Sequence, residues 1–184
     1  DPSRTRDNLE TLRFSLRSLQ RYAPWVNRVF LLTCRPQIPS WLNSAHPSLT
    51  VVHHDEVMRP DLLPTFNSFA ITSHLHRIPG LSPRFIYPED DMPFLAPVTL
   101  DDFVSPEGLL WVFEGKHVAP RSDQIAKPET ASGWNLALAQ SNQLLDQRYG
   151  VLSRRQVNHV PILVDKAMWA QTLANFPDTL ESTV

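Results

Sequence analysis

The sequence contains few of the residues that mark several common classes of protein. Cys34 is its only cysteine, which excludes an internal disulfide and a zinc site built from cysteines, and fits a reducing compartment. The five glycines form neither a G-x-G-x-x-G nor a G-x-x-x-x-G-K-[ST] loop, and no G-x-S-x-G motif is present. Any phosphate binding would therefore use arginines and a metal ion, and a serine hydrolase has no support.

Excess positive charge and long apolar runs are also missing. The formal net charge is −2, so the sequence lacks the basic excess expected of a nucleic-acid-binding protein. No apolar run approaches the roughly 18–20 residues needed to cross a bilayer. The first residues show no secretory signal pattern. We expect neither a nucleic-acid partner nor a transmembrane segment in these residues, and the pattern says nothing about oligomeric state.

The composition that is present indicates a globular domain with stiff connections. A length of 184 residues suits one domain with a sizeable core, and seventeen prolines predict short elements joined by constrained loops. The sequence begins at Asp1 without Met and stops soon after a helical pattern. It therefore reads as part of a larger protein.

Alternating helical and strand patterns predict an α/β fold with helices on the faces of a sheet. Residues 116–132 are polar and proline-bearing, which predicts a mobile loop or lid. The expected helices span residues 7–22, with Asp7 or Asn8 as N-cap, 65–78, 133–148 and 164–175. The expected strands span residues 28–33, 49–54, 83–87 and 109–115.

Three successive acids, Glu89, Asp90 and Asp91, follow the third expected strand. Ligands of α/β sheets bind beyond the carboxyl ends of strands, and carboxylates there could hold a divalent metal. Along an extended strand Asp90 and Asp91 would point to opposite faces, so sharing one ion requires a turn, which Pro88 and Pro93 favour. By spacing alone a solvated acidic turn is the commoner explanation.

Two further groups have chemistry suited to phosphoryl transfer. Arg13 and Arg17 lie four residues apart on one helical face and could bind phosphate oxygens, although a solvated face is commoner. His159 precedes a helical pattern and could serve as general base or transient nucleophile. A histidine taken by itself is more often structural.

Two long stretches together resemble one family. "RDNLETLRFSLRSLQRYAPWVNRVFLLTCRPQIPSWLN", continuing through "HPSLTVVHHDEV" and "LPTFNSFAITSHLHRIPGLSPRFIY" to residue 103, resembles the second homology block of the Stealth proteins. "NQLLDQRYGVLSRRQVNHVPILVDKAMWAQTLANFPDTLEST" resembles the third block. The resemblance implies residues 1–115 as a second-block core, 116–132 as the loop or lid, and 133–184 as a third-block helical segment of the same domain.

The resemblance implies a nucleotide-diphosphosugar-transferase-like (GT-A-like) sheet with flanking helices, incomplete at both ends. It implies transfer of a hexose-1-phosphate from a UDP-sugar to an acceptor saccharide hydroxyl, with release of UMP, in capsule or exopolysaccharide synthesis. Mg²⁺ or Mn²⁺ is the expected cofactor. The bacterial members imply a cytoplasmic, membrane-peripheral location, whereas animal relatives work in the Golgi.

Carried over residue by residue, the resemblance gives Asp91, His159 and Arg17 catalytic roles. Metal binding is expected from Asp90 and Asp91, with Glu89 as third ligand. We also expect substrate contacts from Asp7, Arg13, Asn67, His74 and Arg77.

The sequence departs from the family pattern at several positions. The usual Asn-Asp-Asp is Glu89-Asp90-Asp91, the usual acid of "AIESH" is Thr72, and "TNGQ" is "TCRPQ". The first block and the fourth block are not present. Two alternatives therefore stay open: a metal-dependent glycosyltransferase that releases UDP, and a truncated relative that binds a nucleotide-sugar without turnover.

Overall fold

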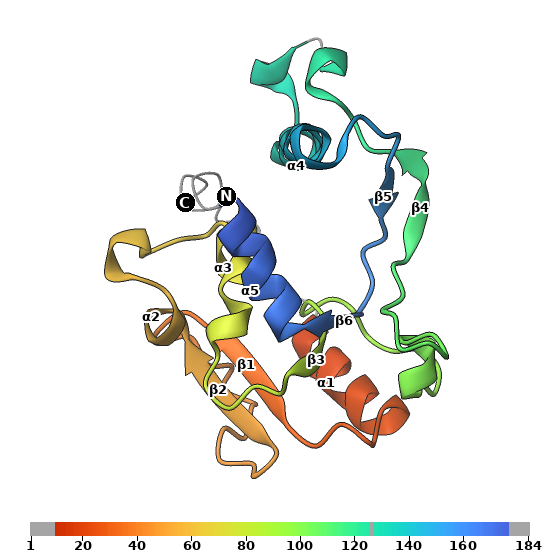
Figure 1. Ribbon diagram of the computed structural model, residues 1–184. Coiled ribbons are helices and arrows are strands. Elements are labelled where there is room, and N and C mark those ends of the chain that lie inside the picture. The colour runs from red at the N-terminus through yellow and green to blue at the C-terminus, as the bar shows by residue number, and fades with distance from the viewer. Residues whose placement is uncertain (1–9, 126, 177–184) are drawn as a thin grey trace. The chain divides into compact units, whose positions relative to one another are not determined.

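The computed structural model describes residues 10–125 and 127–176, which form a mixed α/β structure (Figure 1). These residues divide into two compact units. Unit 1 contains the described residues up to Trp111 and from Pro161 onward, and unit 2 contains Val112–Val160. The α/β class predicted from the sequence is confirmed at this level.

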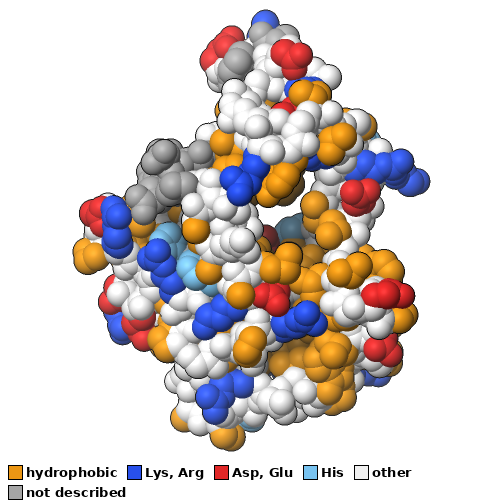
Figure 2. Space-filling view, in the orientation of Figure 1, with side chains coloured by type: hydrophobic (Ala, Val, Ile, Leu, Met, Phe, Trp, Pro, Cys, Tyr) orange, Lys and Arg blue, Asp and Glu red, His pale blue; other side chains and the backbone are white. Residues whose placement is uncertain are grey.

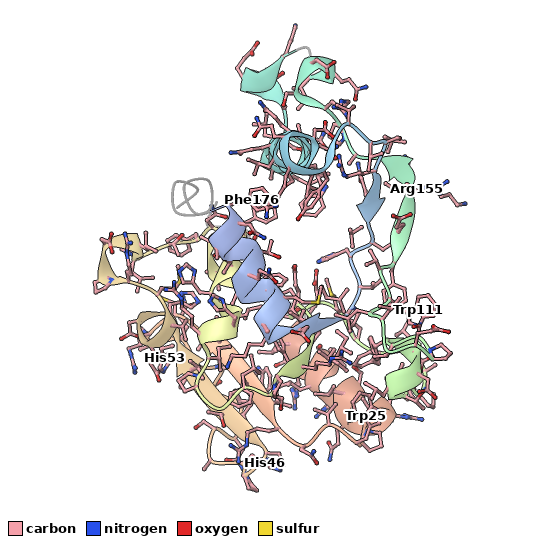
Figure 3. All side chains as sticks on the ribbon, in the orientation of Figure 1. Trp25, His46, His53, Trp111, Arg155 and Phe176 are labelled. Carbon is pink, nitrogen blue, oxygen red and sulfur yellow. The ribbon has the colours of Figure 1, made fainter. Side chains whose placement is uncertain are left out.

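Unit 1 opens with helix α1 (Thr11–Tyr22), which has one apolar face. Leu12, Leu16 and Leu19 on that face are half-buried at the expected helical spacing. Strands β1 (Val29–Thr33) and β2 (Leu49–His53) follow and pair in parallel, with Val29 opposite Leu49 and Thr33 opposite His53. Both strands lie where the sequence predicts them, and Figure 3 labels His46, which precedes β2, and His53, with which β2 ends.

A second pair of strands joins distant parts of the sequence. Strand β3 (Arg84–Tyr87) pairs antiparallel with β6 (Ile162–Asp165), so that Tyr87 lies opposite Ile162. Asp165 then caps helix α5 (Lys166–Asn175), where its Oδ1 accepts from the amides of Ala167 at 3.0 Å and Met168 at 3.1 Å. The sequence predicts β3 and α5 but misses β6.

The core of unit 1 lies where the short helices after β2 pack against the strands. These are α2 (His54–Val57), the 3₁₀ turn Pro60–Leu62, α3 (Ser68–Ser73) and the 3₁₀ turn Leu75–Arg77. Their buried apolar side chains form one cluster with β2: Val52, Val57, Met58, Ala70, Leu75 and Ile78. Burying a Val, Leu, Ile or Met side chain contributes roughly 1.5–3 kcal/mol, so the five larger side chains of this cluster stabilise the unit.

Unit 2 contains helix α4 (Gly133–Tyr149), the antiparallel pair β4 (Glu114–Val118) and β5 (Arg155–Val157), and 3₁₀ turns at Ser122–Gln124 and Pro128–Thr130. Ser132 Oγ caps α4 by accepting from the Asn135 amide at 3.2 Å, and Gly150, with φ 82°, ends it. The predicted helix 133–148 is confirmed.

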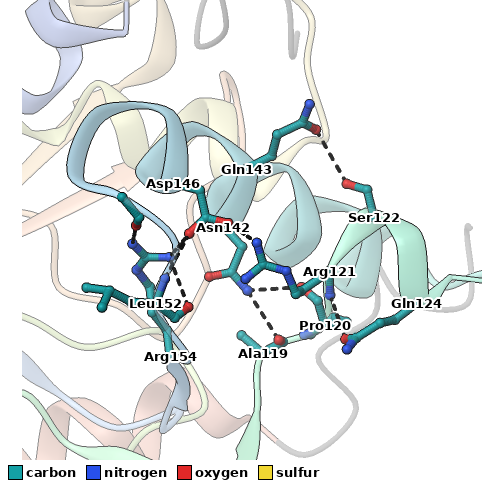
Figure 4. Close-up of polar contacts among 11 residues, drawn as sticks. Ala119, Pro120, Arg121, Ser122, Gln124, Asn142, Gln143, Asp146, Leu152 and Arg154 are labelled. Atoms are coloured by element: carbon teal, nitrogen blue, oxygen red, sulfur yellow. Dashed lines mark hydrogen bonds and ion pairs between the residues drawn. The ribbon is translucent and has the colours of Figure 1, made fainter.

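Polar contacts hold α4 to the segments on either side of it (Figure 4). The Asp146 carboxylate accepts from Arg121 and from Arg154 Nη1, the latter at 2.6 Å, and also from the Leu152 amide at 3.3 Å. Asn142 Nδ2 donates to the carbonyls of Ala119 at 3.2 Å and Pro120 at 3.0 Å. We call Arg121, Asp146 and Arg154 the carboxylate clamp.

Three element predictions need correction. The helix expected over 65–78 is interrupted at His74, because the Ser73 hydroxyl and the His74 ring both bond the Ala70 carbonyl. Its N-cap is Asn67 rather than Thr65. The strand expected over 109–115 is wrong for 109–113, since Leu109, Trp111 and Val112 are exposed and β4 begins at Glu114. The segment 116–132 starts inside β4.

Unit 1 also contains a 3₁₀ turn at Leu100–Asp102, which Thr99 caps. The expected helix 7–22 is confirmed from Thr11 onward. The N-cap predicted at Asp7 or Asn8 lies outside the described residues. Within those residues, no helix has both the length and the apolar character to cross a membrane.

Candidate functional site

The acidic segment forms a turn immediately after β3. The Met92 amide donates to the Glu89 carbonyl at 3.3 Å, which closes the turn over Asp90 and Asp91. Met92 is buried beneath the turn, while Asp90 and Asp91 are exposed. The turn that metal sharing requires is thus present at the carboxyl end of a strand.

This turn brings two of the three carboxylates together. One oxygen of Glu89 and one of Asp91 lie within 4.8 Å of each other, and Asp90 is not part of that group. Two carboxylates so close repel unless a positive group lies between them. Carboxylate oxygens are also the ligands that Mg²⁺ and similar hard cations prefer. The donor set therefore fits a divalent cation: of the three expected ligands, Glu89 and Asp91 lie together and Asp90 does not join them.

A hydroxyl network connects Glu89 to the end of α3. The Tyr87 hydroxyl donates to Glu89 Oε1 at 3.5 Å and lies 3.2 Å from Thr72 Oγ1. Burial raises the pKa of Tyr87, and the charge of Glu89 acts in the same direction. Tyr87 therefore stays protonated and can donate its hydrogen bond to Glu89.

The network places two departures from the family pattern on the same hydroxyl. Thr72 and Glu89, the two positions at which the sequence analysis notes a departure from the pattern of the resembled family, both contact Tyr87. Spacing in the sequence gives no sign of this, because Thr72 and Tyr87 are 15 residues apart. Tyr87 and Thr72 are thus neighbours of the candidate site that the sequence analysis missed.

Helix α1 is fixed to the segment that follows the acidic turn. The Ser18 hydroxyl accepts from the Phe94 amide at 2.8 Å, and both residues are buried. Trp25, marked in Figure 3, donates from Nε1 to the Val98 carbonyl at 2.7 Å. These bonds hold the helix that carries Arg13 and Arg17 beside the segment that carries the acids.

The two arginines of α1 differ in their surroundings. Arg13 pairs with Glu10 at 2.6 Å, and its guanidinium lies over the Trp41 ring, 5.9 Å from the centroid. Arg17 lies one turn further along α1 and is exposed. The fork for phosphate oxygens remains a prediction, since Arg13 is held by these two contacts.

Three expected substrate contacts lie around α3. Asn67 caps the helix through its Oδ1, which accepts from the Phe69 amide at 3.1 Å. His74 is buried, with Nδ1 2.8 Å from the Ala70 carbonyl and 3.0 Å from the Ser73 hydroxyl. Arg77 is exposed. Asp7, the fourth such residue besides Arg13, lies outside the described residues.

His159 is exposed and lies at the end of unit 2. The residue before it, Asn158, is held by two hydrogen bonds. The Asn158 amide donates to the Phe113 carbonyl at 2.7 Å, and Asn158 Nδ2 donates to the Glu114 carbonyl at 3.2 Å. A Cβ atom at Gly115 would lie 2.9 Å from Asn158 Oδ1, so a larger residue at this position would have to displace the Asn158 side chain. The backbone next to His159 is therefore fixed within its own unit.

Comparison with known proteins identifies relatives for most of the sequence. The family model described as Stealth protein CR2, conserved region 2, matches residues 4–111. An exopolysaccharide phosphotransferase of Streptomyces coelicolor is 39% identical over 172 residues, which are 92% of this chain and 28% of the relative. The exopolysaccharide phosphotransferase CpsY of Mycobacterium leprae is 36% identical over 176 residues, 95% of this chain and 32% of the relative.

A human protein shows higher identity over a shorter stretch. The alpha/beta subunits of human N-acetylglucosamine-1-phosphotransferase are 55% identical over 104 residues, which are 56% of this chain and 8% of the human protein. The chain therefore spans less than a third of the length of these relatives.

Proposed function

The chain belongs to the Stealth protein family, and we propose that it forms the core of a sugar-phosphate transferase in exopolysaccharide synthesis. In this proposal, a hexose-1-phosphate moves from a UDP-sugar to a hydroxyl of an acceptor saccharide. The observation that carries the proposal is the paired carboxylates of Glu89 and Asp91 in a turn at the end of β3. The names of relatives that match nearly the whole chain support the same reaction class.

The reaction is a displacement at phosphorus, which takes one step if His159 acts as general base and two steps if His159 acts as nucleophile. The acceptor oxygen bonds to the β-phosphorus of the UDP-sugar, and the bond from that phosphorus to the bridging oxygen breaks. UMP leaves, and the sugar remains attached to the transferred phosphate. We assign the acceptor proton to His159 as general base; alternatively, His159 first carries the hexose-1-phosphate on a ring nitrogen.

The acids and α1 arginines would handle the negative charge of the diphosphate. Glu89 and Asp91 would hold Mg²⁺ or Mn²⁺, with Asp90 beside them, and such an ion neutralises charge on phosphate oxygens when bound. Arg17 would contact the diphosphate, and the fixed position of α1 through Ser18 and Phe94 supports that assignment. Asp7, Arg13, Asn67, His74 and Arg77 remain proposed substrate contacts.

Chain connectivity supports a role for His159 near this turn. Only two residues separate His159 from Ile162, which lies opposite Tyr87 in the β3–β6 pair. Three residue steps span at most about 11 Å.

We propose a GT-A-like sheet as the scaffold and a cytoplasmic, membrane-peripheral location for the reaction.

Product analysis tests the proposed reaction. The complete protein is incubated with Mn²⁺, UDP-N-acetylglucosamine and a panel of methyl hexosides, and the nucleotide and saccharide products are identified by mass spectrometry. UMP with a phosphodiester supports the proposal. UDP with a glycoside would instead assign an ordinary glycosyltransferase, and donor binding without any turnover would assign a non-catalytic relative.

A substitution tests the role of His159. His159→Ala should abolish turnover and leave donor binding unchanged, whereas His117→Ala, an exposed histidine of the same unit, should change neither. Full residual activity in His159→Ala would make His159 structural.

A further inference from the structure

The end of helix α4 and the residues after it expose large apolar side chains. We call residues 148–155, "RYGVLSRR", the exposed loop. Tyr149 is 60% exposed, Val151 74% and Leu152 58%. Single exposed apolar residues are ordinary on a protein surface, whereas neighbouring ones mark an interaction site. Figure 2 shows apolar side chains, with Lys or Arg side chains beside them, over the part of unit 2 that contains α4.

The carboxylate clamp holds the backbone of the exposed loop (Figure 4). The Gly150 amide donates to the Asp146 carbonyl at 2.9 Å, and the Leu152 amide donates to Asp146 Oδ1 at 3.3 Å. Arg154 donates from Nη2 to the Gly150 carbonyl at 3.3 Å and from Nη1 to the Leu152 carbonyl at 3.4 Å. The loop cannot fold its apolar side chains inward without breaking these bonds.

These apolar side chains do not belong to a core of unit 2. Among its described residues, the buried apolar ones are Ala119 and Ala139. Strand pairing places Val118, which is exposed, opposite Arg155 and so extends the apolar surface beside the loop. Apolar area left in water does not stabilise the fold, so this surface is suited to contact something outside unit 2.

The charged residues of the exposed loop all have the same sign. The loop contains Arg148, Arg154 and Arg155 and no acid. Arg154 faces Asp146 in the clamp, whereas Arg155, labelled in Figure 3, is exposed. Arg148 is exposed too, and its guanidinium lies 5.7 Å from the centroid of the Tyr149 ring. Unit 2 has six Lys or Arg against four Asp or Glu, a net charge of +2, although the whole chain has −2.

We propose that the exposed loop binds the surface of an anionic lipid membrane. Val151 and Leu152 enter the headgroup region, with Tyr149 at its edge, and Arg148 and Arg155 contact lipid phosphates. Burial of apolar area together with attraction to anionic lipids drives interfacial binding, and tyrosine is favoured at headgroup depth. Backbone groups that enter this region need hydrogen-bond partners, which the clamp supplies.

The charge pattern favours a membrane over a protein partner. Protein surfaces usually intersperse charges of both signs, so a segment with three arginines and no acid suits a uniformly negative surface better. The inference rests on the membrane-peripheral location proposed above, but not on the reaction. Membrane binding is measured without UDP-sugar or acceptor, so its failure leaves the product analysis unaffected.

Vesicle binding by the complete protein tests the proposal. The protein is sedimented with vesicles of phosphatidylcholine alone and with vesicles in which one third of the lipid is phosphatidylglycerol. We expect at least about tenfold tighter binding to the anionic vesicles at low salt, and release in about 0.5 M NaCl, where exposed charges are screened.

A matched pair of substitutions tests the apolar part of the loop. Val151→Ser combined with Leu152→Ser should weaken binding to anionic vesicles at least about tenfold, because the apolar area that enters the membrane is lost. Serine keeps the amide that bonds Asp146, so amide exchange in α4 should stay unchanged. Val112→Ser, at a residue 65% exposed before the far end of β4, should bind like the unsubstituted protein.

A second pair tests the charged part. Arg155→Ala should weaken binding to anionic vesicles about fivefold, whereas Arg28→Ala, at an exposed arginine of unit 1, should not. Failure of the complete protein to bind anionic vesicles would overturn the proposal, since the loop would then be covered by the rest of the protein. Equal binding by the double serine variant and the unsubstituted protein would overturn it as well.

Discussion

The two units are stabilised by different interactions. Unit 1 has a cluster of buried apolar side chains from β2 through Ile78. In the described part of unit 2, the buried apolar residues are Ala119 and Ala139, and α4 is held by the carboxylate clamp and by Asn142. Unit 1 should therefore respond to loss of apolar volume, and unit 2 to loss of charge.

The largest effect on stability is expected from truncating the core of unit 1. Ile78 is 3% exposed, and Ile78→Ala should lower the free energy of unfolding by about 2–5 kcal/mol, measured by urea titration. Leu109→Ala, at a residue of the same unit that is 69% exposed, should have little effect. Equal losses in the two variants would show that the cluster does not support the unit.

The next effect is expected from the clamp. Asp146→Asn removes the negative charge that both Arg121 and Arg154 face, so amide protection in α4 should fall while protection in unit 1 stays. Exchange mass spectrometry follows both units in one sample. Asp123→Asn, at an exposed acid of unit 2, is the control. Loss of protection in both units would contradict separate stabilisation.

Acidification should destabilise unit 2 before unit 1, because the carboxylate clamp depends on the charge of Asp146. The hydrogen bond from Arg154 is the main reason that the pKa of Asp146 lies below its ordinary value. The clamp therefore contributes fully above the ordinary carboxyl pKa, about 3.9, and its contribution is lost as pH falls through the lowered pKa. We expect α4 amides to lose protection before those of the unit 1 core. If acidification of Asp146→Asn still removed protection from α4 before the unit 1 core, the loss would not come from Asp146, and this explanation would be wrong.

The smallest effect on stability, but a clear effect on metal binding, is expected around Tyr87. Glu89→Asn should weaken Mn²⁺ binding by at least the roughly 10–100-fold typical of losing an outer-shell partner, because it removes one of the two paired carboxylates themselves. Thr72→Glu in addition places a carboxylate on the other side of the Tyr87 hydroxyl and should recover most of the loss. Calorimetry measures both, and Thr99→Glu with Glu89→Asn is the control. A double variant that binds Mn²⁺ no better than Glu89→Asn would show that an acid at position 72 cannot replace the acid at position 89.

The elements that the sequence predicts well are those with local signals. The helix over 133–149 has Ser132 before it and Gly150 after it, and β1, β2 and β3 are apolar runs bounded by polar or proline residues. The misses depend on long-range contacts. β6 is defined by pairing with β3, about 80 residues away, and "LLWVF" resembles a buried strand although much of it is exposed.

In the candidate site too, the features with local sequence signals are predicted and those that depend on long-range contacts are missed. The acids and their position after a strand are readable from the sequence, and so is the need for a turn. That Glu89 rather than Asp90 lies with Asp91 depends on the Met92–Glu89 hydrogen bond and the burial of Met92. The contact of Thr72 with Tyr87 depends on the packing of α3 against β3.

Donor binding by Asp91→Asn tests the central claim most directly. Titration calorimetry with UDP-N-acetylglucosamine is performed with and without Mn²⁺ on the unsubstituted chain, on Asp91→Asn and on Asp101→Asn, an exposed acid of unit 1. We predict that Mn²⁺-dependent binding is lost in Asp91→Asn, with the fold intact, and retained in Asp101→Asn. Unchanged affinity in Asp91→Asn would contradict the assignment of the acidic turn as the metal and diphosphate site.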